Sequence, residues 1–169
     1  MTDTDYKRYG SVVCAAILCL LWPAMAGAWP AQVMRVHDGD TVLVAPTYDT
    51  TSPMRLRLYG IDAPELRQPG GKASKAALKT LLPAGAAIEV IPRGEGKYGR
   101  SVALISHDGR IVNGLMVESG HAWVYAKYCR DALCRQWNRA QKEAARQRLG
   151  LWAGEKPVAP WQWRKGHGS

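Results

Sequence analysis

The sequence predicts an α+β fold, in which a small antiparallel β-barrel of about five strands carries about three helices. Two observations lead to this prediction. Short segments with strand patterning dominate the first half of the chain, and helical periodicity appears between and after them. The length of 169 residues suits one domain with a buried core, and no internal repeat is visible.

The clearest strand signal is the strict alternation over residues 54–59. Met54, Leu56 and Leu58 share one face, while Arg55, Arg57 and Tyr59 share the other. The other expected strands cover residues 34–37, 41–45, 88–91, 102–105 and 110–112, with tight turns at 38–39 and 108–109. Short strands with interspersed helices favour an OB-type barrel, although spacing alone leaves other α+β layouts open.

Three helices are expected, over residues 72–82, over 113–119 and from about 131 to 149. Gly120 and Gly150 suit the positions after the second and third helices, and Asp131 suits the N-cap of the third. The arginines and lysines of the third helix favour a solvated face, with DNA contact as the alternative. Residues 154–169 form a loose basic tail in this interpretation, whose Trp161 and Trp163 either dock on the domain or stack on bases.

Residues 1–28 have the layout of a secretory signal peptide. Lys7 and Arg8 precede an apolar run over 12–22, and Ala26-Gly27-Ala28 suits the cleavage site. The run is shorter than the roughly 20 residues that span a bilayer, although an uncleaved anchor helix remains the alternative. We therefore expect a periplasmic or secreted protein whose domain covers residues 29–153, with no stable membrane association after cleavage.

The net charge of +9 belongs to the mature domain, because the four charges of residues 1–28 cancel. So positive a domain favours polyanionic partners, above all nucleic acid. We expect it to act as a monomer.

After cleavage the chain keeps two cysteines, Cys129 and Cys134. Two cysteines in an oxidising compartment favour a disulfide over a reactive site. Their spacing does not match the usual zinc pairs, so a metal role is the weaker alternative.

Carboxylates and arginines cluster in three short motifs. Asp38-Gly-Asp40-Thr supplies two acids, a second motif running from Arg57 to Glu65 adds Asp62, and Lys97-Tyr-Gly-Arg100 adds another arginine. Clustered carboxylates suit a hard cation such as Ca²⁺, and two arginines suit a phosphate. The combination predicts metal-assisted attack on a phosphodiester.

The same three motifs resemble those of the staphylococcal nuclease (thermonuclease) family, in order and with similar spacing. The resemblance extends from about Met34 to Trp152. It implies an OB-type five-stranded barrel with three helices, and a Ca²⁺-dependent nuclease. It also implies that Asp40 and Asp62 are calcium carboxylates, that Ala63 offers its backbone carbonyl where the family has threonine, and that Asp38 acts through water.

The resemblance also assigns the residues that act on the substrate. It implies that Glu65 is the base or positions the attacking water, and that Arg57 and Arg100 clamp the phosphate. Lys97 and Tyr98 match residues that contact a terminal phosphate, and the base-stacking tyrosine falls at Tyr125 or Tyr128. The loop over residues 66–71 is shorter than in the best-known member.

The function predicted from the sequence is that of an exported, Ca²⁺-dependent, sugar-nonspecific nuclease that acts on DNA and RNA. The resemblance implies 3′-phosphate products, and an OB-type surface favours single strands. The rivals are a non-catalytic nucleic-acid-binding OB module and a binder of other polyanions. Neither rival needs the acids that are present here.

Overall fold

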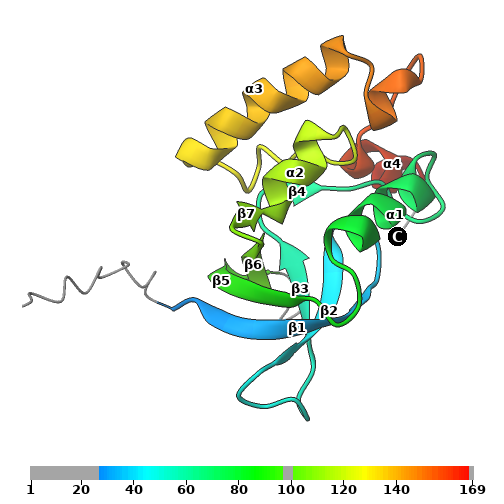
Figure 1. The fold of residues 1–169 in the computed structure, drawn as a ribbon. Coiled ribbons are helices and arrows are strands. Elements are labelled where there is room, and N and C mark those ends of the chain that lie inside the picture. Colours follow the sequence, from blue (N-terminus) through cyan, green and yellow to red (C-terminus); the bar gives the residue numbers. More distant parts are fainter. Residues whose placement is uncertain (1–26, 97–100, 168–169) are drawn as a thin grey trace, which may run out of the picture.

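The chain forms a closed β-barrel of five strands with helices gathered at one end of it (Figure 1). The structure is a computed structural model that describes residues 27–96 and 101–167. The barrel strands are β1 (Trp29–Val36), β2 (Thr41–Pro46), β3 (Met54–Leu58), β5 (Ala87–Glu95) and β6 (Ser101–His107). They follow the order β3-β2-β1-β5-β6, and pairing between β3 and β6 closes the ring. The predicted α+β, OB-type fold is confirmed.

The barrel is mixed, which corrects the expectation of an antiparallel one. Leu56 pairs with Ser101 and Leu58 with Ala103 in a parallel arrangement, whereas the other neighbours in the ring are antiparallel. The reason is topological, because a closed ring with an odd number of strands cannot alternate direction at every step. The short strand β7 (Arg110–Ile111) extends β6 beyond the ring.

The alternation predicted for β3 is the one observed. Leu56 and Leu58 are buried in the core, while Arg55 is exposed and Arg57 is half-buried on the other face. Because side chains of a strand alternate between faces, burying the leucines commits Arg57 to the opposite side of the sheet. This is the face on which the acidic residues described below lie.

The described residues form four α-helices, one more than expected. They are α1 (Gly71–Leu81), α2 (Val112–Glu118), α3 (Ala132–Arg146) and α4 (Pro160–His167), and a 3₁₀ turn, η2 (Gly150–Ala153), follows α3. Buried side chains from the first three of them join the barrel in one core, among them Leu78, Met116 and Trp137. Within the described residues no helix is long and apolar enough to cross a membrane. The predicted signal peptide lies outside the described residues except for its last two positions.

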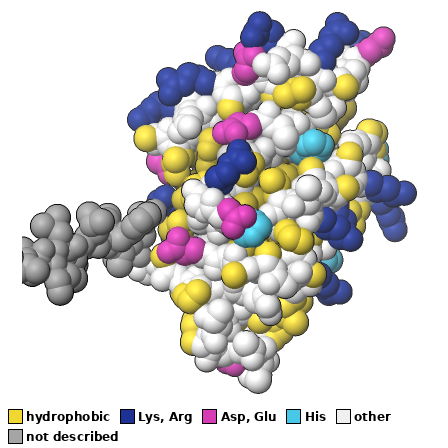
Figure 2. Space-filling view, in the orientation of Figure 1, with side chains coloured by type: hydrophobic (Ala, Val, Ile, Leu, Met, Phe, Trp, Pro, Cys, Tyr) yellow, Lys and Arg dark blue, Asp and Glu magenta, His cyan; other side chains and the backbone are white. Residues whose placement is uncertain are grey.

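Helix α3 begins where the sequence predicts and ends earlier. Asp131 caps it, with its side chain accepting from the backbone N–H of Cys134 at 3.1 Å. The helix ends at Arg146 rather than Leu149, because Arg148 adopts a left-handed conformation with φ of 54°. Its basic residues are exposed, in agreement with the predicted solvated face, and Figure 2 shows basic side chains along this side of the molecule.

The C-terminal segment is a docked helix, so its interpretation as a loose tail is wrong. Pro160 sits at the first helical position, where its fixed φ is compatible with a helix, and both Ala159 and Pro160 are buried. The side-chain amide of Gln68 donates to the carbonyl of Val158 at 2.6 Å. This segment therefore packs on the loop that precedes α1.

A second, two-stranded sheet holds the end of β3 against the helical side. It consists of β4 (Ile61–Asp62) and β8 (Trp123–Val124), with Asp62 opposite Trp123. Both strands are only two residues long, too short for a sequence pattern to reveal. The pairing places the Asp62 motif next to the segment that leads into Tyr125, whose backbone N–H donates to Gly60 at 2.8 Å.

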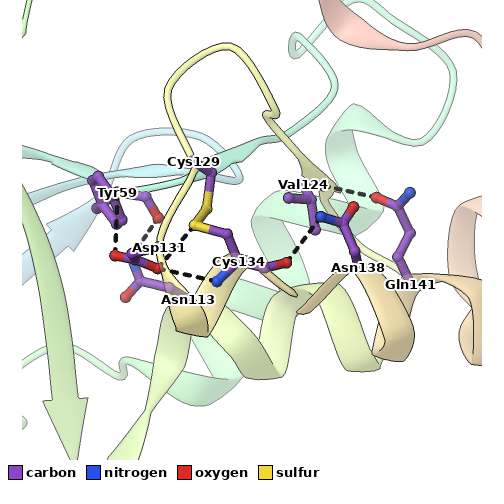
Figure 3. The surroundings of a disulfide bond; sticks show 8 residues. All are labelled: Tyr59, Asn113, Val124, Cys129, Asp131, Cys134, Asn138 and Gln141. Atoms are coloured by element: carbon purple, nitrogen blue, oxygen red, sulfur yellow. Dashed lines mark hydrogen bonds between the residues drawn. A yellow bond between two sulfur atoms is a disulfide. The ribbon is translucent and has the colours of Figure 1, made fainter. Parts of the chain in front are cut away.

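Cys129 and Cys134 form the predicted disulfide, which joins the loop before α3 to the first turn of that helix (Figure 3). The disulfide packs against the barrel at Gly60, where an added Cβ would lie 2.5 Å from the Sγ of Cys129. The Tyr59 hydroxyl lies 3.3 Å from the Asp131 carboxylate. The bridge thus fixes the entrance of α3 on the end of β3.

Candidate active site

The first acidic motif is a tight turn between β1 and β2. The carboxylate of Asp38 accepts from the backbone N–H of Asp40 at 3.0 Å, which closes the turn. Gly39 packs against α1 so closely that an added Cβ would lie 2.0 Å from the hydroxyl oxygen of Ser74. The turn therefore aims the Asp40 side chain into the protein, and Asp38 supports the turn from its rim.

Asp40 and Asp62 are buried side by side, and Arg57 bridges them. Asp40 is 3% exposed and Asp62 is 0% exposed. One terminal nitrogen of Arg57 lies 2.6 Å from a carboxylate oxygen of Asp40, and the other lies 2.7 Å from an oxygen of Asp62. β3 supplies the arginine, while the β1–β2 turn and β4 supply the acids. The pairing of β2 with β3 places Thr41 opposite Arg57 and so brings Asp40 to the arginine.

Backbone and hydroxyl donors complete the surroundings of Asp40. The backbone N–H of Ala63 donates to one carboxylate oxygen at 2.8 Å, and the Thr41 hydroxyl donates to the other at 3.0 Å. Even so, burial raises the pKa of Asp40 to about 7, although Arg57 acts in the opposite direction. Because desolvation raises this pKa, a further positive charge beside Asp40 would favour the ionised form of its carboxyl group.

Glu65 lies in the loop after β4, and the neighbouring Gln68 shapes that loop. The backbone N–H of Glu65 donates to the side-chain oxygen of Gln68 at 3.2 Å, and the backbone N–H of Gln68 donates back to Glu65 at 2.8 Å. Gly71 lies so close that an added Cβ would be 1.9 Å from the Glu65 carbonyl oxygen. The short loop is thus folded tightly, and the Glu65 side chain, 44% exposed, stays accessible.

An arginine that the sequence did not reveal lies on the same acids. From α4, Arg164 places one terminal nitrogen 2.7 Å from an oxygen of Asp62, and the other 2.8 Å from an oxygen of Glu65. That second nitrogen also lies 3.2 Å from the other oxygen of Asp62. Burial opposes the charged form, but these bonds raise the pKa of Arg164 above its usual value. Apart from the Pro160-led, tryptophan-rich run, no sequence signal points to this contact.

The predicted base-stacking tyrosines lie together, and a tryptophan of α4 joins them. Tyr125 and Tyr128 meet edge to face with ring centroids 4.9 Å apart. Trp161 stacks on Tyr125 at 5.3 Å, with the two rings nearly parallel. Tyr128 is half exposed. In the structure Trp161 therefore docks on the domain, while Trp163 stacks on His167 within α4.

The third motif, with its predicted roles for Lys97, Tyr98 and Arg100, lies outside the described residues. The first described residue after it, Ser101, pairs with Leu56 in β3. Leu56 directly precedes Arg57 in the sequence. The described part of the chain therefore brings together Asp38, Asp40, Arg57, Asp62, Ala63 and Glu65.

The described acids fit a hard cation in their chemistry. In the parts of the chain that the structure describes, no group of three or more His, Cys, Asp or Glu side chains forms a ready metal cage. The donor set is instead the buried pair Asp40 and Asp62, which a backbone carbonyl and waters would have to complete. A loosely coordinated oxygen-seeking cation such as Ca²⁺ tolerates that kind of set. The raised pKa of Asp40 fits such an ion as well, because it reflects uncompensated burial of negative charge.

Comparisons with known proteins identify the family of the chain. The family model described as "Staphylococcal nuclease homologue" matches residues 55–154, a range that includes Arg57, Asp62 and Glu65 but neither Asp40 nor Arg164. An Escherichia coli protein described as an uncharacterized endonuclease is 39% identical over 144 residues, covering 85% of this chain and 90% of its own. A micrococcal nuclease from Shigella flexneri is 32% identical over 164 residues, covering 92% and 91%. A staphylococcal-like nuclease from Arabidopsis thaliana is 39% identical over 111 residues, which are 66% of this chain and 33% of the relative.

Proposed function

Because the chain belongs to the staphylococcal nuclease family and is a nuclease that hydrolyses phosphodiesters, we propose that it is an exported, Ca²⁺-dependent enzyme acting on both DNA and RNA. The observation that supports the metal dependence best is the buried pair of carboxylates, Asp40 and Asp62, which share one arginine and lie beside Glu65. Burying two acids is costly, and a site built at such cost suits a cation-binding role.

Each residue of the site has a proposed task in this reaction. Asp40 and Asp62, with the carbonyl of Ala63, would hold the ion, which when bound neutralises the phosphodiester and polarises it. Glu65 would accept a proton from the attacking water or orient it, since its carboxylate is accessible. Arg57 would stabilise charge that grows on the phosphate in the transition state. Arg100 would share that task, and Lys97 and Tyr98 would contact a neighbouring phosphate.

The proposed substrate range follows from how the site would recognise a strand. Phosphate neutralisation and stacking on Tyr125 or Tyr128 require no 2′-hydroxyl, so DNA and RNA would both be accepted. The half-exposed ring of Tyr128 also favours unpaired bases, and hence single strands. Cleavage leaving 3′-phosphates, a monomeric state, and a periplasmic or secreted location without stable membrane association complete the proposal.

The proposal is tested by hydrolysis of single-stranded DNA, duplex DNA and RNA, with calcium or with chelator. We expect calcium to support hydrolysis, chelator to abolish it, and Glu65→Gln to lose most turnover while its KM changes little. A matched control is Glu89→Gln, which makes the same change at an exposed position of β5. Full hydrolysis in excess chelator would refute the metal dependence. Unchanged turnover in Glu65→Gln would return Glu65 to the role of a loop residue.

A further inference from the structure

Arg164 occupies the positions at which a cation would meet the acids of the site. Its guanidinium bonds to both oxygens of Asp62, at 2.7 and 3.2 Å, and to Glu65 at 2.8 Å. Asp62 is fully buried and its two oxygens bond to Arg57 and Arg164, so an ion that ligates this carboxylate would compete with one of these arginines. The guanidinium of Arg164 therefore occupies the Asp62 oxygen that Arg57 leaves free.

Helix α4 holds Arg164 there through contacts that do not involve the acids. Pro160 is buried, and Trp161 stacks on Tyr125 at 5.3 Å. Just before the helix, Val158 accepts a hydrogen bond from Gln68, the residue that also shapes the Glu65 loop. Because α4 is packed on the domain, the backbone of Arg164 is held near the acids by contacts outside its own side chain.

A guanidinium and a divalent cation compete for the same oxygens. Both need the lone pairs of Asp62, and like charges repel strongly when they share one buried carboxylate. Binding of one therefore weakens binding of the other, and this coupling acts equally in both directions. Bonding between Arg164 and Glu65 also engages one oxygen of the carboxylate that is proposed to serve the attacking water.

We propose that Arg164 is an intramolecular competitor of the divalent cation, held on Asp62 and Glu65 by α4 while the metal is absent. Calcium binds as Arg164 leaves Asp62, so the C-terminal helix sets the calcium concentration at which the site fills. This inference rests on the proposed metal dependence and adds an autoinhibitory contact to it.

The test is the calcium dissociation constant of the purified full-length protein, measured by titration calorimetry without nucleic acid. The variant Arg164→Gln loses a charge-assisted, bidentate contact with the acids. It should therefore bind calcium about 10-fold more tightly than the wild type. Lys165→Gln is the matched control, because it removes the same charge from the next residue of α4, which is exposed. It should bind calcium as the wild type does.

Two more variants distinguish the effect of the Arg164 contact on calcium binding from the effect of an unfolded protein. Arg164→Lys keeps the charge but loses the planar fork, so it should bind calcium with intermediate affinity. Trp161→Ala leaves the acids untouched and removes the stack on Tyr125, so it should also bind calcium more tightly than the wild type. Equal or weaker calcium binding by Arg164→Gln overturns the inference and leaves the metal dependence standing. Absence of calcium binding in both wild type and Arg164→Gln overturns the metal dependence and the inference with it.

Discussion

The raised pKa of Asp40 predicts that the metal-free protein loses stability as the pH rises. Burial raises the pKa of Asp40 in the folded protein to about 7, from an ordinary value of 3.8. A carboxyl whose folded pKa is raised contributes its stability below the unfolded pKa, and that contribution is lost as the pH rises through the folded pKa. The difference of roughly three pKa units corresponds to about 4 kcal/mol of unfolding free energy.

Urea unfolding in chelator measures this effect in the wild type and in Asp40→Asn. Between about pH 4 and pH 8 the wild type should lose about 4 kcal/mol relative to the variant, which carries no titrating group at this position. Burial lowers the pKa of His121, which gives both proteins a trend of the opposite sign, so only the difference between the two isolates Asp40. The variant also alters the hydrogen bonds from Arg57 and Ala63, which shifts its stability by a pH-independent amount.

Ionisation of Asp40 should also control the affinity of the site for calcium. Because the cation binds the carboxylate, its apparent affinity should fall about tenfold for each pH unit below about 7. Calorimetry in buffers of different ionisation enthalpy should then detect about one released proton per calcium ion near pH 6. A stability difference between wild type and Asp40→Asn that stays flat from about pH 4 to pH 8 would refute the reasoning, and so would calcium binding that is independent of pH in this range.

Three further predictions concern two individual residues and the disulfide. Arg57→Ala should lower kcat about 10²–10³-fold, and Arg57→Lys should restore only part of it, which steady-state kinetics will check. Reduction of the Cys129–Cys134 disulfide should cost about 2 kcal/mol in urea unfolding, and alkylation of both thiols in the unreduced protein would contradict the bridge. Asn113→Leu should destabilise the protein by about 3 kcal/mol or more. It removes the partners of the Ile105 N–H and of two carbonyls, and a stability within error of wild type would disprove that role.

The sequence predicted those parts of the fold that have a local cause. The alternation around Arg57 follows from burial of one face of β3, and the helices follow from the 3.6-residue period and from the Asp131 cap. The acidic turn at 38–41 was predicted for the same reason, because Asp and Gly favour tight turns wherever they occur. These features depend on neighbours in the chain.

The sequence also identified Asp40, Arg57, Asp62 and Glu65 as one group, but by the order of motifs and not by distance. Their contact depends on β2 pairing with β3 and on β4 pairing with β8. The second pairing is two residues long and leaves no periodic pattern. The roles of Lys97, Tyr98 and Arg100 stay predictions, since those residues lie outside the described part of the chain.

The sequence by itself determined the strands of the barrel, three of the helices, the disulfide partners and the acids of the site, because each of these has a pattern within a few residues. Only the tertiary structure decided that residues 160–167 dock as a helix, that Trp161 stacks on Tyr125, and that Arg164 bonds to Asp62 and Glu65, 102 and 99 residues away. The physical reason is that a contact between distant segments depends on how the whole core packs. An arginine in a basic C-terminal segment has the same local pattern whether it faces solvent or a buried carboxylate.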